Sequence, residues 1–335
     1  MDRAYRAYGL RLAADGDIPG LVPFTPTSRA DVRVWLNQMP APSPGGERVL
    51  WYQSAGNNRH GRPNLTIWRS VSDGAFWFAY DDRTQFLVQA DGSQVWCTWP
   101  AAASIADMAL YLRGPVLGFV LRLRGTVCLH ASAIAVDQSA IAILGAGGGG
   151  KSTTAAGFVK LGFKLLADDV AALDAESGNV RVLSGYPRLN LWPDAAEALY
   201  GSGKALPRLT PAEGINGWWD KRYVELDANR QFQQDPLPLA AVYVLGERIA
   251  GEPAPRVERM GAQDAFMALT DETYVNYALD ESMRAKEFRT LGRLVRTTPV
   301  RCVTVQTGPM RPLDLCNTIL ADYRQLALEL PELCA

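Results

Sequence analysis

The sequence contains few residues that bind metals or form cross-links. It has only two histidines and five cysteines, with no CxxC pair and no Cys/His cluster. The cysteines are widely scattered: Cys97, Cys128, Cys302, Cys316 and Cys334. Structural zinc needs closely spaced ligands, and disulfides are rare in the cytosol. We therefore expect no zinc site, and we interpret the cysteines as reduced, mostly buried thiols of a cytoplasmic protein.

An excess of one charge and a long hydrophobic run are missing as well. The 34 Lys and Arg residues are balanced by 35 Asp and Glu residues, and no basic run is long enough to follow a phosphate backbone. The longest apolar stretches, residues 110–123 and 140–144, are too short or too interrupted to span a bilayer. No apolar segment of a signal peptide follows Asp2, Arg3 and Arg6. These absences predict no nucleic-acid partner, no membrane partner and no secretory signal.

The length and the residue pattern predict two domains. A chain of 335 residues is too long for one small core. Aromatic and β-branched runs bounded by turn residues indicate strands in the first hundred residues. The strands expected there are Tyr5–Leu12, Val49–Gln53, Leu65–Ser70, Phe76–Tyr80, Phe86–Gln89 and Gln94–Thr98, with a loop at Pro40–Gly46. From Ile105 to Leu123 the apolar spacing becomes helical, with a kink expected at Gly114-Pro115. We predict an N-terminal β-rich domain over residues 1–103, a bridging helix over 104–124, and a second domain over 125–335.

Strand and helix patterns are mixed after Gly125. The expected strands are Val127–Val136, Ala140–Leu144, Phe163–Leu173, Val180–Leu183, Arg188–Leu191, Tyr223–Leu226 and Ala240–Leu245. The expected helices are Lys151–Leu161, Gln263–Leu269, Ser282–Val295 and Asp314–Leu330. We expect Phe163–Leu173 to pair with Val180–Leu183 through a hairpin at Glu176–Asn179. This mixture predicts an α/β domain of the α+β kind, with a mixed sheet.

A glycine-rich loop stands between an expected strand and an expected helix. Residues Gly145 to Ser152 have the sequence GAGGGGKS, which fits GxxxxGK(S/T), and the apolar strand AIAIL leads into them. Glycines let backbone N–H groups converge on an anion, and the helix that follows adds its N-terminal dipole. The motif therefore predicts ATP binding by Gly145, Gly147, Gly148, Gly149, Gly150, Lys151, Ser152 and Thr153. Lys151 would contact the β- and γ-phosphates, and the Ser152 hydroxyl would bind Mg²⁺.

A pair of carboxylates follows one helix later. Asp168 and Asp169 end the apolar run in LLADDV. An acidic residue at a strand end beside a phosphate loop is typical of a Mg²⁺ ligand. Two adjacent carboxylates suggest that one holds the metal while the other accepts a proton from an attacking hydroxyl. A solvated turn is the alternative, but the apolar residues on both sides of the pair favour a functional role.

His130 lies in VCLHASAIAV, on the strand before the phosphate-loop strand. A lone histidine in an apolar strand is more often a satisfied core residue than a catalytic one. The position could nevertheless bring His130 to the acid pair on a neighbouring strand, so both interpretations stay open at this point. The other histidine, His60, lies in the polar segment NNRHGRP, and we expect it at the surface.

Together these segments resemble a known family. CLHASAIAV followed by GAGGGGKSTTAAGFVKLGFKLLADDV is similar to the core of HPr kinase/phosphorylase and its relatives, most specifically over Gly125–Leu173. The resemblance implies a fold like the nucleotide-binding domain of phosphoenolpyruvate carboxykinase. It further implies that Asp168 is the catalytic acid/base, that Asp169 is a Mg²⁺ ligand, and that His130 orients the acid. The two aspartates could exchange these roles.

One departure from that family bears on the substrate. Its bifunctional members carry a VxPGRN-like segment after the acid pair, whereas this chain has DKRYVELDANRQF in that region. Phosphorylase activity and HPr as the substrate are therefore not expected. The segments YPRLNLWPDA, DKRYVEL and YGLRLAADGDIPGLVP instead resemble HPr-kinase-related serine kinases encoded beside peptide-maturation genes. Some of those phosphorylate the C-terminal serine of lasso-peptide precursors.

Several other side chains are candidates for the site. Arg188, Lys221 and Arg222 could neutralise the charge of the transferred phosphate, or each could be an ordinary solvated cation. Arg188 is the preferred candidate because it enters a strand directly after Tyr186-Pro187. An aromatic group could line an acceptor cleft, although core packing is the more common role: Trp192, Trp218, Trp219 and Tyr223. The segment of Trp218-Trp219 could form a mobile loop.

These observations predict an ATP-dependent kinase that uses Mg²⁺. We expect Lys151 and the glycine amides to hold the phosphates while one aspartate accepts the proton of a serine hydroxyl in a peptide or small protein. A kinase for a small molecule such as free serine is one alternative, and a nucleotide-gated binding protein with little turnover is another. The charged helix between Glu281 and Arg296 is either a solvated face or an oligomer contact, so a homo-oligomer stays open.

Overall fold

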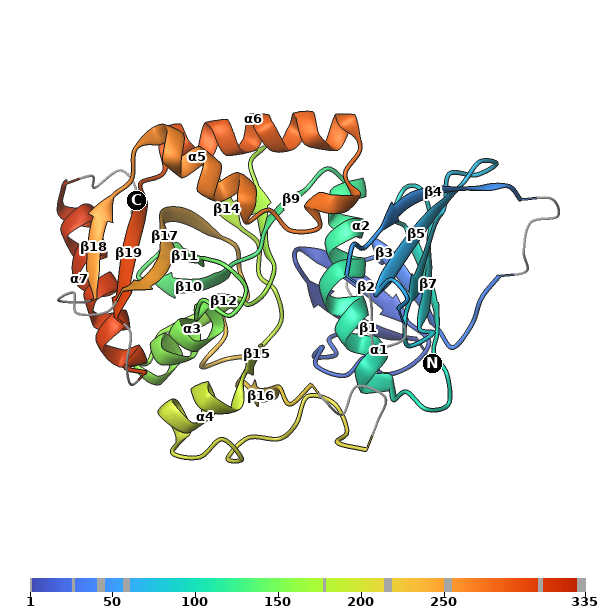
Figure 1. Cartoon of the computed structure of the whole chain (residues 1–335), viewed down its shortest axis with the longest axis horizontal. Coiled ribbons are helices and arrows are strands. Elements are labelled where there is room, and N and C mark those ends of the chain that lie inside the picture. Colours follow the sequence, from blue (N-terminus) through green and yellow to red (C-terminus); the bar gives the residue numbers. More distant parts are fainter. Residues whose placement is uncertain are drawn as a thin grey trace. The chain divides into compact units, whose positions relative to one another are not determined.

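The computed structural model describes residues 2–25, 28–40, 46–56, 61–176, 179–213, 219–249, 255–306 and 310–329 (Figure 1). The predictions made for His60, Trp218, Cys334 and most of the Pro40–Gly46 loop lie outside these residues. The chain forms two compact units. Unit 1 consists of Met1–Gly125, Thr210–Asp220 and Val275–Met283, and unit 2 consists of Thr126–Leu209, Lys221–Tyr274 and Arg284–Ala335.

Unit 1 is built on an eight-stranded sheet with the order β1-β2-β3-β8-β7-β6-β5-β4. Its strands are β1 (Arg3–Ala7), β2 (Leu10–Ala14), β3 (Val32–Leu36), β4 (Arg48–Gln53), β5 (Leu65–Ser70), β6 (Phe76–Tyr80), β7 (Gln85–Val88) and β8 (Gln94–Thr98). The hairpin expected between the last two strands is confirmed. The single strand predicted over Tyr5–Leu12 is wrong, because Tyr8 and Gly9 both take positive φ angles, 55° and 77°. Such a pair of residues makes a tight hairpin turn, so the segment folds back on itself as β1 and β2.

The helix predicted over Ile105–Leu123 is confirmed as three consecutive segments of unit 1: α1 (Ile105–Tyr111), the π-helical turn η1 (Leu112–Val116) and α2 (Leu117–Leu123). Ser104 and Asp107 form a capping box that begins α1. Pro115 lies inside the π-helical turn, which explains the local change of helical pitch. The Phe119 ring packs edge-on against the sheet residues Phe76 and Phe78, at centroid distances of 4.8 and 5.3 Å. The short η2 (Asn276–Ala278) also belongs to this unit, because the Trp51 indole donates to the Ala278 carbonyl at 2.9 Å.

Unit 2 is built on a nine-stranded mixed sheet, which confirms the predicted α/β class with a mixed sheet. The strand order is β12-β10-β11-β17-β14-β13-β9, and β19 pairs with both β17 and β18. The strands are β9 (Val127–Leu129), β10 (Ser132–Val136), β11 (Ser139–Leu144), β12 (Lys164–Ala167), β13 (Ala171–Asp174), β14 (Arg181–Val182), β17 (Leu237–Ile249), β18 (Arg256–Arg259) and β19 (Val300–Gln306). β11, β17 and β19 run parallel to one another. A separate two-stranded sheet pairs β15 (Arg188–Leu191) with β16 (Arg222–Glu225).

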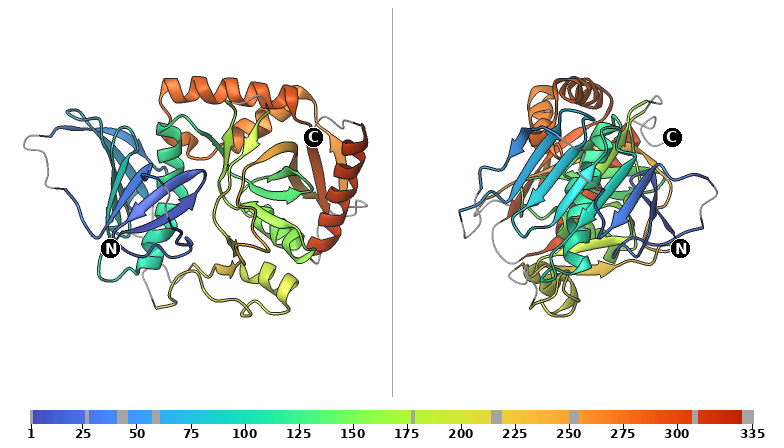
Figure 2. Two further views of the ribbon diagram at one scale, coloured as in Figure 1. Left: turned by 180° about the vertical axis from the view of Figure 1, so that it is seen from behind. Right: turned by 90° about the vertical axis from the view of Figure 1, so that its right-hand side faces the viewer.

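Helices cover both faces of the unit 2 sheet. The helices are α3 (Lys151–Lys160), α4 (Pro193–Tyr200), α5 (Ala262–Asp271), α6 (Glu281–Thr297) and α7 (Pro312–Glu329). On one face, Ile141 and Ile143 of β11 pack with residues of α3 and α7, which lie side by side (Figures 1 and 2). On the other face, Ala142 and Leu144 pack with residues of α5 and α6. A strand buried on both faces is continuously apolar, which explains the sequence AIAIL.

Two strands predicted as continuous are interrupted in unit 2. The expected strand Val127–Val136 splits into β9 and β10 around His130, and the expected strand Phe163–Leu173 splits into β12 and β13 around the two aspartates. β12 pairs with β10, whereas β13 pairs with β9 and β14. Each of these two segments therefore leaves one part of the sheet and joins another part at its polar residues. The apolar pattern predicted the strands correctly but not these breaks.

Among the residues that the structure describes, no helix is long and apolar enough to cross a membrane.

The contact between α3 and α7 depends on a glycine. A Cβ atom on Gly157 would lie 2.7 Å from the Cys316 sulfur, which itself lies 3.2 Å from the Thr154 carbonyl oxygen. Gly157→Ala should therefore lower the free energy of unfolding by about 1–3 kcal/mol, although alanine is the better helix former. Chemical denaturation would measure this change, and adding Cys316→Ala should recover part of it.

Gly292→Ala is the matched control. This glycine lies inside α6, where an added Cβ would lie 3.7 Å from the Arg296 guanidinium, an ordinary van der Waals distance. The substitution should stabilise the protein by up to about 1 kcal/mol, because only helix propensity changes. Equal effects of the two glycine substitutions would contradict the close approach at Gly157.

Candidate functional site

The glycine-rich loop joins the end of β11 to the start of α3. Gly148 and Gly150 have φ angles of 78° and 108°, values that residues with a Cβ rarely adopt. The Gly149 amide donates to the Ala146 carbonyl at 2.9 Å, and a Cβ on Gly149 would lie 2.9 Å from that same oxygen. Gly150 occupies the N-cap of α3 without a side-chain cap, so the first N–H groups of the helix are available to an anion. The loop therefore has the backbone geometry of a phosphate cradle.

Lys151 points back over this loop. Its ammonium group donates to the carbonyl oxygens of Gly145 and Ala146, the latter at 3.3 Å, and lies 3.8 Å from the Glu272 carboxylate. Only 7% of the side chain is exposed. Burial lowers the pKa of Lys151, and the negative charges of Glu272, Asp169 and Asp168 partly oppose this effect. The lysine charge is thus held at the mouth of the loop, where phosphate oxygens would be neutralised.

Asp168 is buried among hydrogen-bond donors. Its two carboxylate oxygens accept from the Ser132 hydroxyl at 2.7 Å and from the Asn190 backbone N–H at 3.2 Å, and the Ser152 hydroxyl also donates to this carboxylate. Burial raises the pKa of Asp168 and the neighbouring charge of Asp169 raises it further, while these hydrogen bonds act in the opposite direction. The structure therefore joins Asp168 directly to Ser152, the hydroxyl that follows Lys151.

Asp169 points in a different direction because its backbone is left-handed, with a φ of 68°. Aspartate tolerates this conformation better than most residues, and such outliers gather at functional sites. Its carboxylate lies 3.4 Å from Nε2 of His130, and 42% of the side chain is exposed. Burial would raise the pKa of Asp169, but the hydrogen bond and charge of His130, together with Lys221 and Lys151, lower it overall. The left-handed conformation of Asp169 thus lets two adjacent carboxylates contact different partners.

His130 connects Asp169 to a residue that sequence reasoning missed. Its Nδ1 lies 3.6 Å from the Glu272 carboxylate, and its backbone N–H donates to the Glu272 carbonyl at 2.7 Å. Glu272 follows α5 directly, and the chain beyond it runs along β9, where the Tyr274 amide donates to the Cys128 carbonyl. Burial raises the pKa of Glu272, and the charges of Lys151 and His130 partly oppose this effect. His130 therefore lies between two carboxylates, and the interpretation as a plain core histidine does not explain these contacts.

Sequence reasoning also missed Ser132 and Asn190. Ser132 lies two residues after His130, and this spacing could have indicated it, because alternate residues of a strand face the same side. Asn190 contributes only its backbone N–H, so its residue type gives no signal. Glu272 lies far from the motif in the chain, and nothing in its local pattern distinguishes it.

The three predicted cations have different surroundings. The Arg188 guanidinium lies 3.2 Å from the Glu225 carboxylate and 4.0 Å from the Tyr223 ring centroid, and both of these residues belong to β16. Arg222 donates to the Leu206 carbonyl at 3.2 Å. Lys221 lies 5.5 Å from the Trp192 ring centroid, and its charge affects the pKa of both Asp169 and Lys151. The charge of Lys221 is therefore close enough to act on Asp169 of the carboxylate pair.

A small cavity of about 80 Å³ borders the loop at Gly149 and Gly150. Its lining combines loop and α3 residues with apolar side chains and two arginines: Gly149, Gly150, Thr153, Thr154, Arg248, Pro255, Val305, Met310, Arg311, Pro312, Asp314 and Leu315. Gly149, Gly150 and Thr153, which were all predicted to bind ATP, line this cavity. The cavity is smaller than the usual small-molecule site, whose volume is about 300–1,000 Å³.

The donor set near the loop suits Mg²⁺ better than zinc. Within the described part of the chain, no three His, Cys, Asp or Glu side chains cluster as a metal site. Mg²⁺ binds through one or two carboxylates together with water and substrate phosphates, so it does not need such a cluster. The hydrogen-bonded pair of Ser152 and Asp168 offers one hydroxyl and one carboxylate of this kind.

The raised pKa of Asp168 predicts how stability depends on pH. Above the folded-state pKa the buried carboxylate is ionised and costs folding free energy, and this cost is lost as the pH falls through that pKa towards the ordinary value of 3.8. Asp168→Asn removes the ionisation. Relative to the parent protein, the free energy of unfolding of the variant should therefore be larger, meaning a more stable fold, at about pH 8 than at about pH 4. Urea denaturation at several pH values would measure this difference.

Asp227→Asn is the control of opposite sign. Hydrogen bonds from the Asn229 and Arg230 amides lower the pKa of Asp227, so its ionised form stabilises the fold above the unfolded-state pKa. The loss caused by Asp227→Asn should shrink as the pH falls. A pH-independent difference for Asp168→Asn would contradict its raised pKa.

Comparison with known proteins gives a similarity in structure. No protein-family model matches the chain, and no curated protein matches its sequence. Among solved structures, the chain is similar to the Hpr(Ser) kinase/phosphatase from Coxiella burnetii, with 15% sequence identity. The match covers 60% of this chain and 98% of that protein, with a TM-score of 0.29.

Proposed function

We propose that the protein is an ATP-dependent phosphotransferase. The observation that carries the proposal is the convergence of Lys151, Asp168, Asp169 and His130 around a glycine loop of phosphate-cradle geometry. These residues come from three separate segments, and the strand breaks at His130 and at the aspartates bring them together. Phosphoryl transfer depends mainly on positioning and electrostatic stabilisation, which such a set of groups can supply. We also propose that unit 2 has the nucleotide-binding fold of phosphoenolpyruvate carboxykinase, as the sequence resemblance implies.

The contacts of the two aspartates support exchanging the roles first expected for them. Asp168 touches the Ser152 hydroxyl and has little exposed surface, which suits a residue that holds Mg²⁺ beside the loop serine. Bound there, Mg²⁺ would neutralise charge on the phosphates. Asp169 is partly exposed and paired with His130, so it can reach an acceptor hydroxyl and take its proton. The raised pKa of Asp168 favours the first assignment, but a base must first be within reach of its proton.

The acceptor that we propose is a serine hydroxyl of a peptide or small protein. The absence of the VxPGRN-like segment argues against HPr as the acceptor, and the segments that resemble peptide-maturation kinases favour a peptide such as a lasso-peptide precursor with a C-terminal serine. Lys221 would neutralise charge near Asp169 during transfer.

An assay with γ-labelled ATP and Mg²⁺ tests this function. Serine-ending peptides, HPr and free serine serve as acceptors, and we expect label on a peptide. Lys151→Ala should lower transfer at least about 100-fold without unfolding the protein. Label on free serine would instead indicate a small-molecule kinase. Tight ATP binding without acceptor-dependent ADP release would indicate a nucleotide-gated binding protein and contradict the proposal.

The same assay separates the two aspartates. Asp169→Asn should lower kcat by about 100-fold or more, because the proton acceptor is lost, while Mg²⁺-dependent ATP binding is kept. Asp168→Asn should raise the Mg²⁺ concentration needed for half-maximal ATP binding by about tenfold or more. Equilibrium binding of a fluorescent ATP analogue measures the second effect without turnover. The reverse pattern would restore Asp168 as the base.

Glu272→Gln tests the link between His130 and Lys151. The Glu272 charge raises the pKa of Lys151, so its removal should lower that pKa further. ATP affinity requires the charged lysine, and it should therefore be lost at a lower pH in the variant than in the parent protein. Asp271→Asn is the control, because this neighbouring charge acts on the pKa of Glu272 and is not among the causes that shift that of Lys151. Identical pH profiles for parent and Glu272→Gln would rule out the link.

A further inference from the structure

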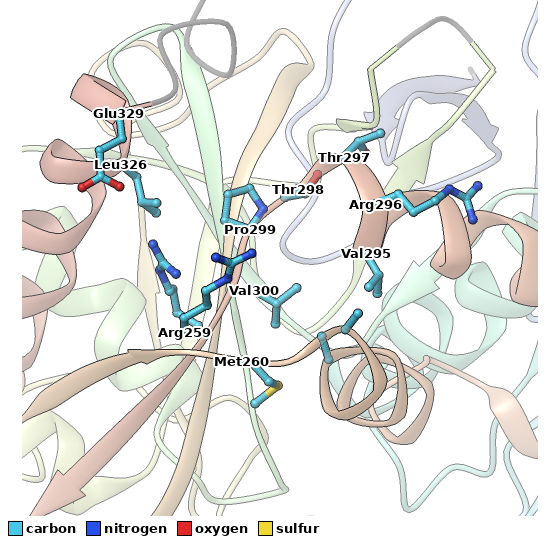
Figure 3. A pocket seen from close by; sticks show the side chains of 13 residues that line it. Arg259, Met260, Val295, Arg296, Thr297, Thr298, Pro299, Val300, Leu326 and Glu329 are labelled. Carbon is cyan, nitrogen blue, oxygen red and sulfur yellow. The ribbon is translucent and has the colours of Figure 1, made fainter.

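A second cavity, of about 780 Å³, lies in unit 2 away from the glycine loop (Figure 3). It is formed by β18, by the start of β19 and by the ends of α5, α6 and α7. Part of its lining is apolar, from Met260, Val295, Val300 and Leu326. The volume is within the usual range of small-molecule sites. β17 separates β19 from β11, the strand that leads to the glycine loop, so the cavity and the loop belong to different strands of the sheet.

Two arginines lie side by side on the wall of this cavity. Arg259 of β18 and Arg301 of β19 are direct cross-strand partners, so their side chains leave the same face of the sheet close together. Like charges in this arrangement are unfavourable. Arg301 lies 3.3 Å from the Asp322 carboxylate, which also accepts from the Tyr243 hydroxyl at 2.9 Å. The Asp322 carboxylate thus offsets the charge of Arg301.

The charge of Arg259 is not offset in the same way. Within the described residues, Arg259 makes no ion pair. Its side chain lines the cavity (Figure 3). The nearby Glu329 carboxylate accepts from Gln325 of its own helix at 2.9 Å, and the Arg296 side chain points away from the cavity (Figure 3). The cavity therefore presents one uncompensated guanidinium, a second one beside it, and an apolar wall.

We propose that this cavity binds a small molecule that carries a phosphate or carboxylate group beside an apolar portion. Guanidinium groups bind both kinds of oxyanion through paired hydrogen bonds. A bound anion between Arg259 and Arg301 relieves their repulsion, while the apolar portion covers Val295, Val300 and Leu326. This site is independent of the proposed phosphotransfer, because none of its residues belongs to the glycine loop or the carboxylate pair.

Calorimetric titration of the full chain with three probes tests the proposal: phenyl phosphate, benzoate and inorganic phosphate. The titrations use Lys151→Ala protein, so that binding at the glycine loop is weakened and does not mask the cavity. We expect phenyl phosphate to bind more tightly than inorganic phosphate, since only phenyl phosphate covers the apolar wall. If benzoate binds more tightly than phenyl phosphate, the natural ligand carries a carboxylate. If phenyl phosphate binds more tightly than benzoate, the natural ligand carries a phosphate.

Arg259→Gln should weaken phenyl phosphate binding by about tenfold or more, because a charge-assisted hydrogen bond is lost. Arg256→Gln is the matched control: it removes the same charge from the same strand, but Arg256 pairs with Glu258 and does not line the cavity. Without ligand, Arg259→Gln should keep or slightly raise the Tm, since the substitution removes a repulsion.

Three outcomes would overturn the proposal. The first is Arg259→Gln protein that binds phenyl phosphate within twofold of its parent. The second is an equal loss of affinity in Arg256→Gln, which would indicate a general effect of net charge. The third is inorganic phosphate that binds as tightly as phenyl phosphate, which would exclude a contribution from the apolar wall.

Discussion

The burial of Asp168 is the constraint on which the rest of the site depends. A carboxylate that has only 4% of its surface exposed must be surrounded by donors, because an unpaired buried charge costs more than the fold can supply. Ser132, Ser152 and the Asn190 N–H provide those donors from three different elements: β10, α3 and β15. Their convergence fixes the start of α3, and with it the glycine loop, relative to the two aspartates.

The strand breaks are the means by which this convergence is reached. A continuous strand would place successive side chains on opposite faces of the sheet, inside the two apolar cores. The left-handed Asp169 ends that alternation, so Asp168 stays buried while Asp169 is partly exposed beside His130. At His130 the neighbouring partner is Glu272 rather than another strand of the main sheet. The polar residues thus lie where the sheet pairing changes, and their hydrogen bonds replace the ladder bonds that are lost there.

The resulting electrostatics are a compromise between burial and pairing. Burial raises the pKa of Asp168 and Glu272 and lowers that of Lys151, so each buried group is pushed towards its neutral form. The mutual attraction of the charges opposes that tendency. Asp169 differs because 42% of its side chain is exposed and His130 is beside it, and its pKa is lowered. The pKa values of two chemically identical neighbours are therefore shifted in opposite directions, which is a common way for a site to give two residues separate roles.

The sequence by itself determined the loop from Gly145 to Ser152, the strand before it, the helix after it and most of the other elements of unit 2. These features are local, since periodicity, glycine content and apolar runs depend on near neighbours along the chain. Only the tertiary structure decided which residues meet Asp168, His130 and Lys151. Glu272 and the Asn190 N–H come from distant parts of the chain, and a backbone N–H has no residue signature. The breaks at His130 and Asp169 were also undecided, because an apolar pattern does not state where a strand changes its partner.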